Sequence, residues 1–146
     1  MIAQTIQLAL APVFVLVAMG NILNILSGRL GRVVDRSRHL QTRHGATSDR
    51  EHDMIVIEIR NTDRRIALIG QAMRLLVISG LAIGACVALL FIEEIANFHF
   101  TGLAAGAFLI AIGLMMWALV LFLRETQIAA ASLRIPADYL ELHRKL

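Results

Sequence analysis

The side chains best suited to chemistry in this sequence are arginines that recur at helical spacing. Arginine outnumbers lysine by thirteen to one. Arg29, Arg32, Arg36, His39 and Arg43 follow one another at intervals of three and four residues, so they share one face of a helix. A guanidinium group can bind phosphate or carboxylate through two parallel hydrogen bonds, which an ammonium group cannot do. We therefore expect this stripe of basic residues to bind anions.

Two kinds of anion fit the stripe, and the sequence leaves both open. Beside a membrane, Arg29, Arg32, Arg36 and Arg43 would attract anionic lipid headgroups at roughly 1 kcal/mol each. Alternatively, they form ion pairs with the acidic residues that follow, which are Asp49, Glu51, Asp53, Glu58 and Asp63. A basic stripe without interleaved aromatic residues is a weak nucleic-acid site, so we expect no nucleic-acid partner.

Residues for catalysis or metal binding are poorly placed. His39, His44 and His52 lack the i, i+4 spacing of a helical metal site. Glu93 and Glu94 are adjacent, so they point to different sides of a helix and make a poor acid–base pair. We therefore predict a protein that is not an enzyme and that binds no metal or cofactor.

The elements that position these residues are set by three apolar runs. The 146 residues are 58% hydrophobic and 17% charged, with a mean hydropathy of +0.70, which is too apolar for an ordinary soluble domain. Residues 1–28, 75–92 and 95–123 carry no charged side chain. About twenty apolar residues cross a bilayer core. We therefore predict an all-α membrane protein in a single domain, 1–146, with spans at about 4–26, 70–92 and 102–123.

The basic residues predict the orientation of these spans. Ten lie between Ser27 and Arg74, and four follow Leu123. Short loops rich in arginine and lysine remain on the cytoplasmic side of a membrane. We therefore expect the N-terminus outside, the C-terminus inside, and a cytoplasmic segment at about 27–69 between the first two spans.

That segment has the pattern of an antiparallel helical hairpin, like a short coiled coil. Apolar residues recur at intervals of three and four on both sides of Gly45. Gly45 suits the end of one helix, and Ser48 with Glu51 resembles a capping box at the start of the next. The tail, 124–146, should begin as a continuation of the third helix up to Arg134, and residues 137–146 would lie on the membrane surface.

Counting outward from a turn near Ala46 predicts a polar cluster inside the membrane. This register puts Asn21 opposite Gln71, with Asn24 and Arg74 close by. An arginine held there among protein groups would be a site candidate. The alternative is that Arg74 extends to the headgroups and the amides lie in the interface.

Small residues predict where the spans approach closely. Gly80 and Gly84 lie one helical turn apart in the second span, and Gly102 and Gly106 repeat this spacing in the third. Such pairs allow two helices to pack closely in a membrane. We expect these glycines at the contact between the second and third spans; the alternative is an interface between subunits.

Two segments resemble a known family. RLGRVVDRSR at 29–38 directly follows the first span, and RRIALI at 64–69 leads into the second. Both resemble signatures of a family of small bacterial three-helix membrane proteins catalogued as a domain of unknown function. The resemblance covers nearly the whole chain and implies a multi-pass protein of the bacterial inner membrane. It implies no activity, and residues 61–63 are more polar than that family's pattern.

Two classes of function fit these features. The first is a non-enzymatic accessory or scaffold protein that forms homo-oligomers or docks on a larger membrane complex. The second is an oligomeric, anion-favouring channel in which the first span lines the pore with Asn21 and Asn24. Both classes require partners within the membrane.

Overall fold

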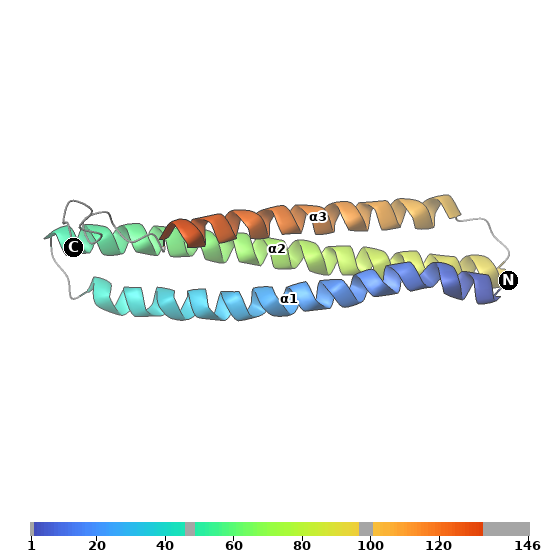
Figure 1. Ribbon diagram of the computed structural model, residues 1–146, viewed down its shortest axis with the longest axis horizontal. Coiled ribbons are helices and arrows are strands. Elements are labelled where there is room, and N and C mark those ends of the chain that lie inside the picture. The colour runs from blue at the N-terminus through green and yellow to red at the C-terminus, as the bar shows by residue number, and fades with distance from the viewer. Residues whose placement is uncertain (1, 46–48, 97–100, 133–146) are drawn as a thin grey trace, which may run out of the picture.

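The protein is a bundle of three long α-helices (Figure 1). The computed structural model describes residues 2–45, 49–96 and 101–132. The helices are α1 (Ile2–His44), α2 (Asp49–Ala96) and α3 (Thr101–Ser132). Each is long and apolar enough to cross a membrane. The predicted all-α architecture with three helices able to span a bilayer is therefore confirmed.

The three helices differ in length, and this leaves a two-helix hairpin at one end. At 1.5 Å per residue, α1, α2 and α3 are about 64, 72 and 48 Å long. We call the end where α1 turns into α2 the hairpin end, and the opposite end the N-terminal end. At the hairpin end, α1 and α2 continue beyond α3 (Figure 1). Gly45 lies in the turn, and Ser48 of the expected capping box lies outside the described residues.

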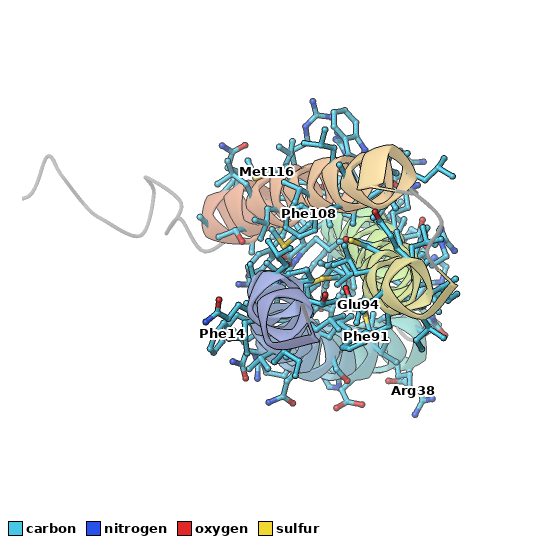
Figure 2. All side chains as sticks on the ribbon, turned by 90° about the vertical axis from the view of Figure 1, so that its right-hand side faces the viewer. Phe14, Arg38, Phe91, Glu94, Phe108 and Met116 are labelled. Atoms are coloured by element: carbon cyan, nitrogen blue, oxygen red, sulfur yellow. The ribbon has the colours of Figure 1, made fainter. Side chains whose placement is uncertain are left out.

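α2 is the helix against which the other two pack. It contacts both α1 and α3 along their lengths, whereas α1 and α3 share little direct contact. The end-on view shows α1 and α3 on different sides of α2 (Figure 2). At the N-terminal end, Thr5 Oγ1 donates a hydrogen bond to Glu94 Oε2 over 3.0 Å and joins α1 to α2. The packing of α1 relative to α3 therefore depends largely on α2.

Buried positions recur every seven residues in all three helices. This spacing is typical of helices that pack side by side over many turns. In α1 the series is Thr5, Pro12, Met19, Leu26, Val33 and Leu40; in α2 it is Ile55, Thr62, Ile69, Leu76 and Ile83; in α3 it is Ala104, Ala111, Ala118 and Glu125. The core is therefore a long seam, and one of its positions is occupied by a carboxylate.

Alanines rather than glycines form the contact between α2 and α3. Ala111 and Ala118 are buried against α2, and Ser79 Oγ donates to the Ala111 carbonyl over 2.6 Å. The glycines expected at this contact lie elsewhere. A Cβ atom at Gly80 would meet Met19 and Leu16 of α1, and nothing lies within 4 Å of the Cβ position of the others, which are Gly84, Gly102 and Gly106.

The register of α1 against α2 also differs from the expected one. Counting from a turn near Ala46 puts Met19 opposite Met73, but Met19 lies 3.7 Å from the Cβ position of Gly80 and accepts a 3.8 Å contact from Ser79. Side chains lean toward the N-terminus of their own helix. In an antiparallel pair they therefore lean in opposite directions, and equal residue counts from the turn do not predict which side chains meet.

The alanine contact predicts a difference between two alanine positions. Ala111→Leu should destabilise the bundle by about 1–3 kcal/mol, because the added atoms have no space at a fully buried helix contact. Ala67→Leu, at an exposed position of α2, should change stability by no more than about 0.5 kcal/mol. Thermal unfolding followed by circular dichroism measures both, and equal stability of the two variants would contradict the packing.

Candidate functional site

A cluster of three charged residues lies where all three helices meet near the hairpin end of α3. Glu125 continues the buried series of α3, and its side chain is 0% exposed. Arg65 Nε of α2 donates to Glu125 Oε1 over 2.9 Å. Arg29 Nη2 of α1 lies 3.1 Å from Glu125 Oε2. We call Arg29, Arg65 and Glu125 the ion cluster.

Arg29 is further held by an aromatic ring. Its guanidinium carbon lies 5.2 Å from the centre of the Phe122 ring, one turn before Glu125 on α3. A cation over an aromatic face contributes about 0.5–2 kcal/mol, with the larger values where water is excluded. Arg29 therefore contacts α3 through both a carboxylate and a ring, and these contacts join the two helices that otherwise touch little.

The ion cluster carries one more positive than negative charge. The Arg29 and Arg65 side chains are 23% and 22% exposed, so each guanidinium group retains some access to solvent while the carboxylate has none. Within the described chain Glu125 Oε2 accepts no hydrogen bond of good geometry, although Arg29 lies beside it. A buried carboxylate loses its hydration, and here two arginines replace it. The arrangement suits an ionic contact that holds the three helices together.

The other predicted arginines lie along the hairpin. Arg36 donates to Glu58 over 2.8 Å, and Arg43 donates to Glu51 over 2.8 Å. Arg32 is exposed, and the described residues give it no ion pair. The ion-pair interpretation thus describes two members of the stripe, Arg36 and Arg43, whereas Arg29 pairs with Glu125 of α3. Anion or lipid binding by the stripe stays a prediction.

The four residues of the expected polar cluster do not come together. Asn21 and Asn24 of α1, and Gln71 and Arg74 of α2, all have exposed side chains. In the part of the chain that the structure describes, no hydrogen bond joins any of them. The reason is that all four lie outside the buried series of α1 and α2, so their side chains face away from the contact between the two helices.

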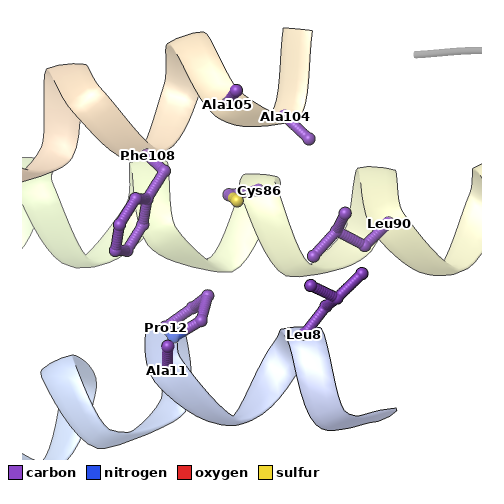
Figure 3. Close-up of a pocket in the computed structure, with 8 residues that line it drawn as sticks. All are labelled: Leu8, Ala11, Pro12, Cys86, Leu90, Ala104, Ala105 and Phe108. Carbon is purple, nitrogen blue, oxygen red and sulfur yellow. The ribbon is translucent and has the colours of Figure 1, made fainter. Parts of the chain in front are cut away.

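An apolar cavity of about 230 Å³ lies between the three helices toward the N-terminal end (Figure 3). Leu8 and Pro12 of α1, Cys86 and Leu90 of α2, and Phe108 of α3 line it. The Cys86 thiol is the most polar side-chain group in this lining. Such a surface accommodates hydrocarbon and offers no acid–base pair or metal ligand set.

Sequence analysis missed Glu125, the central residue of the site. It directly follows the charged residue that ends the third apolar run, and its partners lie 60 and 96 residues away along the chain. A signal was present. Ala104, Ala111, Ala118 and Glu125 are spaced by seven, so the carboxylate falls on the face that small residues mark for close packing.

The ion cluster predicts that Glu125 stabilises the protein far more than other acidic residues do. Glu125→Gln should cost about 3–5 kcal/mol, because it leaves two arginines without a counter-charge in a largely buried place. Glu58→Gln is the matched control and should cost no more than about 1 kcal/mol, because its pair with Arg36 is half exposed. Thermal unfolding of both variants gives the comparison.

A third variant separates charge from packing. Replacing the whole ion cluster by apolar residues, as R29M/R65M/E125L, should recover most of the loss, because no buried charge then lacks a partner. If E125Q unfolds as easily as E58Q, the cluster does not stabilise the bundle.

Comparison with known proteins agrees with the resemblance found in the sequence. A family model described as "Protein of unknown function (DUF2721)" matches residues 9–135. No curated protein and no solved structure matches the chain at a significant level. The matched segment includes the ion cluster and most of all three helices. The chain therefore belongs to the DUF2721 family of proteins of unknown function.

Proposed function

We propose that this protein is a non-enzymatic accessory or scaffold protein of the bacterial inner membrane, which assembles with further copies through α1 and presents its hairpin to a larger membrane complex. The observation that carries this proposal is that Asn21 and Asn24 are exposed on α1 within a run of residues that carries no charge. An amide facing hydrocarbon without a hydrogen-bond partner costs free energy. A second helix can supply that partner.

The same face of α1 is shaped for close approach by another helix. Gly20, Asn24 and Gly28 follow one another at intervals of four residues, and all three are exposed. Nothing lies within 4 Å of the Cβ position of Gly20, and near Gly28 only the end of Arg32 does, at 4.0 Å. Small residues beside asparagine are the combination that favours helix association in membranes. This packing argument does not depend on the free-energy cost of amides that face hydrocarbon.

The orientation in the membrane is part of the proposal. The ion cluster brings the start of the hairpin and the last part of α3 to one level, so Arg124 and the basic residues of the hairpin lie toward the same end of the bundle. Basic segments remain on the cytoplasmic side. The hairpin and the C-terminus would then be cytoplasmic, and the N-terminus would lie outside. The bacterial inner membrane itself is inferred from the family resemblance.

The hairpin offers a surface for docking. Met54 and Ile57 are 67% and 59% exposed on α2, in the part of the hairpin that extends beyond Ser132 of α3. No lipid covers them if the hairpin stands in the cytoplasm. Exposed apolar side chains on a rigid element mark interaction surfaces. A protein partner would bury both.

Self-assembly through α1 is tested by comparing substitutions in α1 with a glycine substitution in α3. Gly20→Leu and Asn24→Leu should shift the purified protein toward monomer in mild detergent, by tenfold or more in the dissociation constant, because each removes close packing or an amide contact. Gly113→Leu, at an exposed and open position of α3, is the control. Native mass spectrometry measures copy number. A monomeric parent protein, or equal effects at Gly20 and Gly113, would contradict assembly through α1.

A second function is favoured by the same exposed amides. In a ring of copies, Asn21 and Asn24 would line a pore, and the excess of arginines at its cytoplasmic mouth would favour anions. Purified protein in liposomes should then conduct chloride, and Arg32→Glu should shift its selectivity toward cations. Absence of flux in the parent protein would exclude the channel and leave the accessory role.

A further inference from the structure

A groove between α2 and α3 lies beside the ion cluster and has a different character. Its volume is about 400 Å³. It is lined by two arginines, one amide and three apolar side chains, which are Arg64, Arg124, Gln127, Leu68, Ile128 and Ala131. Each arginine is the chain neighbour of a member of the ion cluster. Side chains of adjacent helical residues diverge, so these arginines face the groove instead of Glu125.

Arg64 and Arg124 form no ion pair in the described part of the chain. Both are exposed, and the ion pairs of the described residues involve neither of them. Asp63 and Glu125 are the chain neighbours of Arg64 and Arg124, and Glu125 is shared between Arg29 and Arg65. The four arginines and these two carboxylates leave two positive charges in excess. The groove therefore attracts an anion.

The position of the groove relative to the membrane indicates which kind of anion fits it. Arg124 is the first charged residue of α3, after an apolar run that ends at Leu123, so it marks the level at which the hydrocarbon region ends. Leu68 lies one turn nearer the membrane than Arg64. Ile128 and Ala131 form the apolar part of the lining toward the other end of the groove. A ligand that combines a phosphate with a hydrocarbon chain matches both the charges and the apolar lining.

We propose that this groove binds an anionic phospholipid. Arg64 and Arg124 hold the phosphate oxygens, the Gln127 amide contacts the polar headgroup, and an acyl chain passes Leu68 into the bilayer. Guanidinium groups favour such phosphate contacts because they donate paired hydrogen bonds. The site is distinct from the arginine stripe of α1, whose members Arg36 and Arg43 face carboxylates of the hairpin. It stands whether or not the protein assembles through α1.

The test is lipid retention measured by native mass spectrometry. The full-length protein in mild detergent is mixed with phosphatidylglycerol or with phosphatidylcholine of the same chain length. The parent protein should retain phosphatidylglycerol preferentially. R64Q/R124Q should bind it about tenfold more weakly or worse, since each lost arginine removes roughly one phosphate contact. R64K/R124K should keep part of the preference.

The control is R38Q. Arg38 is exposed on α1, points away from the bundle in the end-on view (Figure 2), and makes no ion pair among the described residues. It should leave retention unchanged. Equal retention by the parent and R64Q/R124Q, or an equal loss in R38Q, would overturn the site.

Inorganic phosphate separates a lipid site from a simple anion site. Millimolar phosphate should not displace phosphatidylglycerol, because it lacks the chain that contacts Leu68. Complete displacement would overturn the lipid assignment. If R64Q/R124Q loses its helical circular dichroism, R124Q alone gives the same comparison, because one exposed arginine at a helix surface does not determine folding.

Discussion

The stability of the bundle depends on a buried carboxylate that requires positively charged partners. Glu125 occupies a core position of α3, where an unpaired charge would cost several kcal/mol. Its two partners come from α1 and α2, so the requirement that both arginines reach it sets the level of all three helices relative to one another. Apolar packing along a seven-residue seam does not select one register so sharply, because a shift of one repeat leaves similar contacts.

The distribution of carboxylates divides the arginines into two groups. One group faces acidic partners: Arg29 and Arg65 pair with Glu125, and Arg36 and Arg43 form pairs across the hairpin. Arg64 and Arg124 sit one residue from members of the ion cluster, yet they face the groove between α2 and α3. Arginines at adjacent positions of one helix therefore differ in role: one holds helices together, and its neighbour is available to a ligand. Charge counts along the sequence do not distinguish these two roles.

Much of the fold follows from local patterns, and most of the site does not. The three apolar runs and the periodicity around Gly45 predict the helices, because length and composition alone decide whether a helix can cross a bilayer. The ion cluster joins residues up to 96 positions apart, and no local pattern predicts that contact. The expected register is wrong at Met19 and Gly80, because counting residues from the turn ignores the direction in which side chains lean. Glycine spacing misassigned the α2–α3 contact because alanine is small enough to form it.

The limited contact between α1 and α3 has a mechanical consequence. At one end these helices are fastened by Arg29, Glu125 and Phe122, while toward the other end an apolar cavity lies between the three helices and the polar tie of Thr5 joins α1 to α2. The ionic and ring contacts between α1 and α3 therefore lie near the hairpin end, and apolar packing together with Ser79 holds the rest of the bundle. We expect a change in the lateral pressure of the surrounding bilayer to alter the angle between α1 and α3 most at the N-terminal end, because the charged contact is farthest from it.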